Sequence, residues 1–156
     1  MNIAQQIIEA HKLKFGSQPP LQQCSVSGST FINADCFDVF PFIEDKSIDA
    51  IICDLPYGTT QNKWDSVLPL DKLWVEYKRI LKPNGVVLLF GAEPFSSVLR
   101  TSNLNEYKYD WIWEKPQGTG FLNAKKRPLI SYETISVFYK KQCLYNPQFE
   151  NGKPYV

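Results

Sequence analysis

The amino-acid sequence predicts an α/β protein with a mostly parallel sheet of about five strands and an antiparallel strand pair late in the chain. The segment "IDAIICD" (48–54) is nearly continuous in apolar residues, which is typical of a parallel strand covered on both faces. A helix with one apolar face follows, and a second buried segment, "VVLLFG" (86–91), comes directly after it. Further on, the alternation in "YKYDWIWEK" (107–115) and "YETISVFYK" (132–140) indicates two more strands.

The N-terminal elements are short. Residues 3–15 are expected to form an amphipathic helix, and "GSQPPLQQCSVSGS" (16–29) has the composition of a linker. The segment "STFINAD" (29–35) is predicted to be a strand that ends in an acid. A short helix should follow over residues 36–47, broken near Pro41 because proline removes a helical hydrogen bond.

The clearest helix is predicted in "LDKLWVEYKRILKPNG" (70–85). Asp71 is the expected N-cap, and the "KPNG" segment should end the helix. A shorter helix is expected over residues 93–103, with Pro94 in its first turn. The apolar face of the first helix falls at helical spacing. Its members are Leu70, Leu73, Trp74, Tyr77, Ile80 and Leu81.

The later strands at 107–115 and 132–140 are joined by a polar, basic loop, "PQGTGFLNAKKRPLIS". The chain divides into three regions: an N-terminal helix and linker (1–28), one α/β domain (29–142) and a C-terminal tail (143–156). In an α/β sheet, ligands bind at the carboxyl ends of parallel strands. Asp35 and Asp54 both lie at such ends.

Composition excludes several classes of protein. The single histidine, His11, lies in the N-terminal extension, so a Ser-His-Asp triad and a multi-histidine metal site are set aside. The apolar segments are far shorter than the roughly 20 residues that span a bilayer. The four cysteines show no paired spacing, which favours reduced thiols and a cytoplasmic location. Residues 1–99 carry a net charge of −3 and residues 100–156 one of +4. This asymmetry fits either ordinary solvation or a face for a polyanion.

The segment "DLPYG" (54–58) fits a clamp for a planar amine. The carboxylate of Asp54 and the backbone carbonyl of Leu55 can each accept a hydrogen from an exocyclic amine and stabilise the charge that develops when its nitrogen attacks. Pro56 holds the residue before it extended, which aims that carbonyl. Tyr57 offers a flat ring on which a base extruded from a duplex can stack. The competing interpretation is an ordinary turn after a strand, with Tyr57 covering the core.

The chain resembles the S-adenosylmethionine-dependent amino-methyltransferases of DNA, in the branch where the catalytic motif precedes the cofactor loop. The resemblance covers about residues 29–156. It rests on "INADCFDVF", "DLPYGTTQNKWD", "LWVEYKRILKPNGVVLLFG", the hairpin region from "WIWEKPQGTGF" to "SYETISVFYK", and "YNPQF". It implies a partial Rossmann-like methyltransferase fold, a role in DNA methylation and restriction–modification, double-stranded DNA as partner, and phage-type or prophage-type relatives.

Carried over to this sequence, the resemblance implies that Asp54, Leu55, Pro56 and Tyr57 form the target-base site. Asp35, together with Asp54, would bind the cofactor, with Asp35 beside its adenine; the alternative for Asp35 is a helix N-cap. The basic loop would contact DNA phosphates through Lys125, Lys126 and Arg127. Packing and turn roles are expected for Phe90 and Gly91, and either a structural or a substrate role for Glu133.

Two departures from the family matter. Leu55 replaces the usual first proline, and Asp rather than Ser at position 54 favours adenine N6 over cytosine N4. The glycine-rich loop for the cofactor is expected after these blocks. The one Gly-x-Gly, in "QGTGF" (117–121), follows a proline and leads into a basic loop, so it is rejected as that loop.

We therefore expect a truncated or partner-dependent enzyme with little activity alone, in which a second copy or another chain completes the sheet. A non-catalytic nucleic-acid-binding or regulatory fragment is the alternative. A methyltransferase acting on a protein glutamine or on RNA is a third interpretation.

Overall fold

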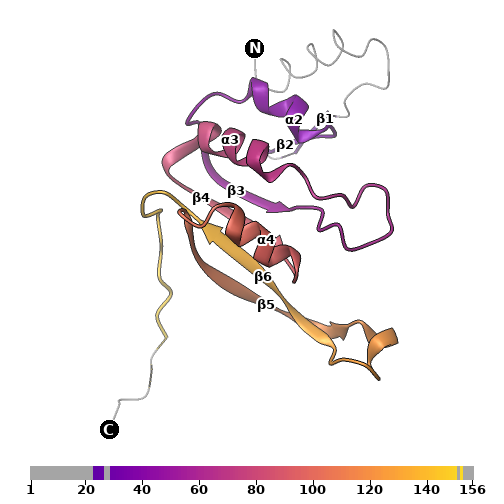
Figure 1. Ribbon diagram of the computed structural model, residues 1–156. Coiled ribbons are helices and arrows are strands. Elements are labelled where there is room, and N and C mark those ends of the chain that lie inside the picture. Colours follow the sequence, from indigo (N-terminus) through magenta and orange to yellow (C-terminus); the bar gives the residue numbers. More distant parts are fainter. Residues whose placement is uncertain (1–22, 27–28, 151, 153–156) are drawn as a thin grey trace.

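The computed structural model describes residues 23–26, 29–150 and 152, and in these ranges the chain forms two sheets (Figure 1). A small antiparallel sheet pairs β1 (Gln23–Val26) with β2 (Ser29–Ile32). The main sheet has the order β3-β4-β6-β5. Its strands are β3 (Ile48–Asp54), β4 (Leu81–Gly91), β5 (Tyr107–Thr119) and β6 (Ile130–Phe138).

The α/β class and the late antiparallel pair are confirmed, but the main sheet is mixed rather than mostly parallel. β3 and β4 are parallel, whereas β6 is antiparallel to both of its neighbours, β4 and β5. The reason is that β5 turns back through a hairpin and β6 inserts between β4 and β5. The main sheet has four strands instead of five because β2 pairs with β1 instead of joining it.

The described N-terminal elements partly follow the prediction. The helix expected at residues 3–15 lies outside the described residues, and part of the expected linker is strand β1. The helix expected over residues 36–47 is broken, as predicted: α2 (Cys36–Val39) passes into the 3₁₀ helix η1 (Phe40–Phe42), which contains the proline.

Helix α3 (Leu70–Ile80) buries the predicted apolar face. Leu73, Trp74, Tyr77 and Ile80 are buried in it. The predicted N-cap Asp71 is wrong: Pro69 occupies the cap position, and Asp71 lies in the first turn. The helix ends before "KPNG", because the chain becomes extended at Leu81 and pairs there with Ile48.

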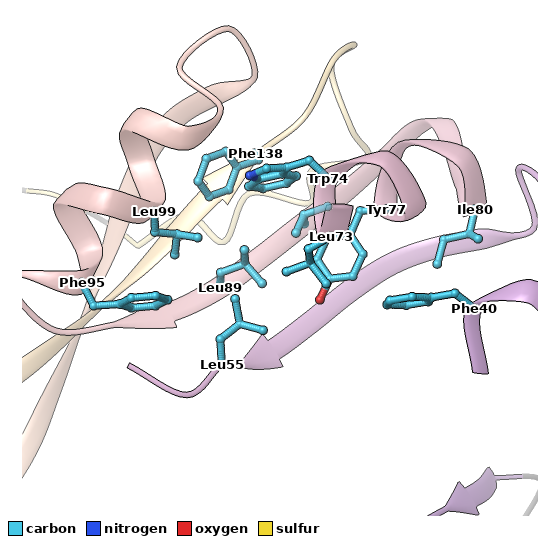
Figure 2. Close-up of a cluster of buried hydrophobic side chains, with 11 residues drawn as sticks. Phe40, Leu55, Leu73, Trp74, Tyr77, Ile80, Leu89, Phe95, Leu99 and Phe138 are labelled. Carbon is cyan, nitrogen blue, oxygen red and sulfur yellow. The ribbon is translucent and has the colours of Figure 1, made fainter. Parts of the chain in front are cut away.

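Helix α4 (Phe95–Ser102) packs beside α3 on the same face of the sheet. Pro94 is its N-cap residue, one position before the predicted first turn. The indole Nε1 of Trp74 donates a hydrogen bond to Ser102 Oγ at 2.7 Å, which joins the two helices. Figure 2 shows their side chains meeting β4 in one core, where Leu73, Leu89 and Leu99 have no exposed surface.

The opposite face of the sheet, called the open face below, is not covered by any described helix. Residues paired across strands share a face of the sheet. Ile52, Leu88 and Tyr109 lie on the open face, as do Phe90 and Trp111 in the next row. β3 is therefore an edge strand with an exposed face within the described residues, and Ile52 is 67% exposed. The prediction that it is central and covered on both faces is wrong for this part of the chain.

The β5–β6 hairpin extends well beyond the sheet (Figure 1). β4 ends at Gly91, which pairs with Thr134, whereas β5 continues to Thr119. β5 therefore continues for seven residues beyond Ile112, the residue that pairs with Thr134, which corresponds to about 20 Å of strand. Residues 116–119 and 130–131 of the loop expected at 116–131 are therefore strand. The tip holds the 3₁₀ helix η2 (Phe121–Asn123).

Candidate functional site

Three connecting segments of the chain follow strands that run toward the same edge of the main sheet. β3 and β4 are parallel, and β5 runs in the same direction because β6 is antiparallel to both β4 and β5. Their carboxyl ends therefore lie at the same edge (Figure 1). Residues 55–69, 92–94 and 120–129 follow these ends. The predicted "DLPY" segment and the predicted basic loop are two of the three.

The Asp54 carboxylate is positioned as the last residue of β3 and is exposed. Its Oδ1 accepts a hydrogen bond of 2.7 Å from the Tyr57 hydroxyl. Burial raises the pKa of Tyr57, and its hydrogen bond to Asp54 and the charges of Asp54 and Glu133 raise it further. Tyr57 therefore remains a protonated donor, and the second carboxylate oxygen of Asp54 is left to face a ligand.

The Leu55 side chain anchors this segment in the core. It is 5% exposed and points toward Leu89 and Phe95 (Figure 2). The Tyr57 ring stacks on Phe95, with centroids 5.0 Å apart and planes at 17°. One face of Tyr57 is thus covered by α4, so its opposite face or its edge must be the part that a ligand meets. The sequence predicted a role for the Leu55 carbonyl but missed the packing of its side chain.

The buried carboxylate of Asp65 holds the loop after the "DLPY" motif in place through hydrogen bonds. It accepts hydrogen bonds from the backbone N–H groups of Gly58, Thr59 and Thr60 at 2.8, 3.0 and 2.6 Å. The Thr60 side chain and these N–H groups stabilise the anion and lower the pKa of Asp65 to about 2. Gly58 has φ 68°, a left-handed conformation that glycine adopts without strain. Sequence reasoning missed Asp65, although an acid closing the polar "GTTQNKW" segment was a signal for it.

These residues line an open pocket of about 450 Å³. Its walls come from the motif and from the loop that Asp65 braces. The lining residues are Asp54, Leu55, Pro56, Tyr57, Thr59, Thr60, Trp64 and Asp65. Trp64 is 71% exposed, so it adds an aromatic surface at the rim. A pocket that combines one open carboxylate oxygen with two aromatic rings suits a flat polar ring.

Asp35 is the residue that precedes α2. Its Oδ1 accepts a hydrogen bond from the Phe37 N–H at 2.8 Å and thereby caps α2, as one of the two alternatives predicted. Burial raises the pKa of the Cys36 thiol, with further increases from Asp35 and Cys53. The start of α2 thus lies beside Cys53, the residue before Asp54. The structure places the two predicted cofactor residues on neighbouring elements.

The predicted DNA-contacting residues lie at the tip of the β5–β6 hairpin. Lys125, Lys126 and Arg127 are exposed and follow η2. The backbone N–H groups of Lys126 and Arg127 both donate to the Asn123 carbonyl, at 2.8 and 3.0 Å, which holds the turn. Lys125, Lys126 and Arg127 do not line the pocket, but the hairpin that carries them extends from the same edge of the sheet.

Glu133, Phe90 and Gly91 have structural contacts. Glu133 forms a partly buried ion pair with Lys115 across the β5–β6 hairpin. The Phe90 ring packs edge-on against Trp113, with centroids 5.7 Å apart. A Cβ at Gly91 would lie 2.6 Å from Ser96 Oγ, so glycine allows α4 to approach β4 closely. Phe90 and Gly91 therefore have packing roles in the structure.

No protein-family model matches the chain. Among curated proteins, the chain is 29% identical over 119 residues to the Type II methyltransferase M1.MboII of Moraxella bovis, covering 69% of the chain and 45% of that protein. Among solved structures, M1.HpyAVI in complex with SAM aligns at TM-score 0.57 and 21% identity, over 78% of this chain and 60% of that one. M1.HpyAVI alone aligns at TM-score 0.56. The predicted partial fold is confirmed, and the chain spans about half the length of its curated relative.

Proposed function

We propose that this chain, which is related in sequence and fold to the amino-methyltransferases of DNA, transfers a methyl group from S-adenosylmethionine to the exocyclic amine of a DNA base. Adenine N6 is the favoured target because position 54 is an aspartate. The observation that carries the proposal is the pocket at the end of β3, where Asp54 is held by Tyr57 and keeps one carboxylate oxygen open. We further propose that it acts in the cytoplasm and that its relatives include phage-type enzymes.

The residues of the pocket would hold the amine of a flipped base. The open oxygen of Asp54 and the Leu55 carbonyl accept its two hydrogens, which favours the positive charge that develops on nitrogen. Tyr57 and Trp64 offer ring surfaces to the base. S-adenosylmethionine, when bound, would supply a methyl group carried on a sulfonium. The amine nitrogen held by Asp54 and the Leu55 carbonyl would accept that methyl group and then lose a proton. No covalent enzyme intermediate is required.

The carboxylates of Asp35 and Asp54 fit a role in holding the cofactor. Each has one oxygen in a hydrogen bond, to Phe37 N–H and to the Tyr57 hydroxyl respectively. Within the described residues, the second oxygen of each forms no hydrogen bond and can receive one from a polar ligand such as the adenine amine. Lys125, Lys126 and Arg127 would contact the phosphates of double-stranded DNA beside the pocket.

A second copy or a second chain would complete the sheet at β3. Parallel strands are normally covered on both faces, and a free edge offers unpaired backbone groups. Ile52 is 67% exposed on this edge strand, and Trp111 and Trp113 are 45% and 48% exposed on the open face. Because of this uncovered surface, we expect little activity from the chain alone.

The first test is calorimetric titration of the purified chain with S-adenosylmethionine, followed by transfer of labelled methyl groups to adenine-containing duplex DNA. Asp54→Asn should lower the transfer rate by a factor of about 10²–10³. Asp49→Asn is the matched control, since Asp49 lies near the other end of β3, paired with Lys82. Equal rates for Asp54→Asn and wild type would overturn the assignment of Asp54.

The need for a partner is tested by sedimentation velocity. Ile52→Lys should abolish self-association, whereas Val75→Lys should not, because Val75 is equally exposed (65%) but lies on α3. A monomer that methylates DNA efficiently would overturn the proposal that another chain is needed.

A non-catalytic nucleic-acid-binding role is the second candidate. The exposed basic tip of the hairpin supports it, since this surface needs no cofactor. DNA binding that weakens steeply with salt, without any calorimetric signal for S-adenosylmethionine, would favour this function over catalysis.

A further inference from the structure

A second pocket, of about 280 Å³, opens at the edge of the sheet opposite Asp54. β3, β4 and β5 begin at this edge, and β6 ends there. The pocket is therefore lined by residues at or before the start of β3, β4 and β5 and by residues that follow β6. Its floor includes Leu81, Pro83 and Gly85. Its charged residues are Lys46, Lys78, Lys82, Lys140, Lys141 and Glu106.

Two of the five lysines are neutralised by neighbouring acids. Lys82 Nζ lies 2.6 Å from Asp49 Oδ1, and Lys78 Nζ lies 3.8 Å from Glu106 Oε1. Within the described ranges, Lys46, Lys140 and Lys141 form no ion pair. The pocket thus keeps an excess of three positive charges in one concave site.

A purely structural account explains only part of this cluster. The carboxyl end of a helix favours cations, and Lys78 lies in the last turn of α3, with Lys82 at the start of β4 directly after it. Lys140 and Lys141 come from the other side of the pocket, after β6. Lys46 has φ 55°, an uncommon conformation for a residue other than glycine, and its N–H donates to the Arg79 carbonyl. This contact uses the backbone of Lys46, so it does not account for the charge of its side chain.

We propose that this lysine pocket binds a phosphate group, at a site separate from the Asp54 pocket. Lysine recognises phosphate as a point charge. The three lysines that form no ion pair within the described ranges line a space of about 280 Å³, which is large enough for a small anion. The seven residues of β3 separate the two pockets by about 20 Å. The phosphate belongs either to a nucleic-acid backbone that continues past the target base or to a free phosphorylated molecule.

The test is calorimetric titration of the purified chain with inorganic pyrophosphate at low ionic strength. Lys140→Gln/Lys141→Gln should weaken binding about tenfold, since each charge-assisted contact contributes a few-fold. The matched control, Lys63→Gln/Lys72→Gln, removes the same charge from two exposed lysines that do not line this pocket and should leave pyrophosphate affinity unchanged. Both pairs are exposed, and thermal melting checks that each variant folds.

Binding of a 20-base-pair duplex, followed by fluorescence anisotropy against salt, identifies the source of the phosphate. A salt slope reduced by about 1–2 in Lys140→Gln/Lys141→Gln would assign the site to the nucleic-acid backbone. Weaker pyrophosphate binding with unchanged duplex binding would assign it to a free phosphorylated molecule. Either result supports the proposal whether or not the chain transfers methyl groups. Absence of pyrophosphate binding, or equal losses in both double variants, would overturn it.

Discussion

Replacing Leu55 by alanine tests whether the candidate catalytic segment is held in place by the hydrophobic core. The Leu55 side chain is 5% exposed and packs with Leu89 and Phe95 (Figure 2). The substitution removes three buried carbon atoms, which corresponds to a transfer free energy of about 2.4 kcal/mol. A cavity at the end of the core relaxes only partly, so the expected loss of unfolding free energy is about 3 kcal/mol.

Urea unfolding followed by tryptophan fluorescence measures this loss. A domain of this size has a total stability of about 8–15 kcal/mol, so Leu55→Ala should still fold but melt about 6–12 °C lower. Val75→Ala is the control, because Val75 lies on α3, away from this segment, and is 65% exposed. Its expected cost is below about 1 kcal/mol. A loss under about 1 kcal/mol for Leu55→Ala, or equal losses for both variants, would refute the reasoning.

Three further predictions concern the pocket and its support. Asp65→Asn should lower the melting temperature above about pH 4, where the Asp65 carboxylate stabilises the native state. Because the native pKa of Asp65 is depressed, this stabilisation is lost as the pH falls toward 2, and the melting curves of both proteins should converge there. Tyr57→Phe removes the hydroxyl that donates to Asp54 and should cost about 1 kcal/mol in urea unfolding; no change would show that this hydrogen bond is not stabilising. Gly91→Ala places a Cβ 2.6 Å from Ser96 Oγ. Thermal unfolding should show a loss of about 1–3 kcal/mol, and an unchanged melting temperature would contradict the close packing of α4.

Elements with strong local periodicity were predictable from the sequence. The apolar face of α3 shows a 3.6-residue period, and the aromatic residues of β5 alternate with period two. The position of Asp54 at the end of a strand followed from the apolar run before it. Local patterns of this kind depend only on which face of an element is buried.

Features that depend on contacts between distant residues were not predictable. The insertion of β6 between β4 and β5 rests on pairs such as Phe90 with Ile135, which no local pattern encodes. The brace made by Asp65 rests on backbone N–H groups in a loop without periodicity. Ile52 is exposed because, within the described residues, no further strand lies beside β3 in the main sheet.

In the usual family motif, a proline at the position of Leu55 makes the backbone rigid. In this chain, packing and hydrogen bonds hold the same segment in place. Leu55 is held by the core, Tyr57 by Phe95 and Asp54, and the following turn by Asp65. Leu55→Pro would exchange one source of rigidity for the other. Because Pro56 favours an extended conformation at residue 55, proline should be tolerated there. By restricting the unfolded chain it should stabilise the protein by about 0.4–1 kcal/mol. Its ring fills less of the core than leucine, so the net loss should be about 1–2 kcal/mol, smaller than that of Leu55→Ala. A larger loss than for alanine in parallel urea titrations would mean that the backbone of residue 55, rather than its side chain, sets the geometry of the pocket.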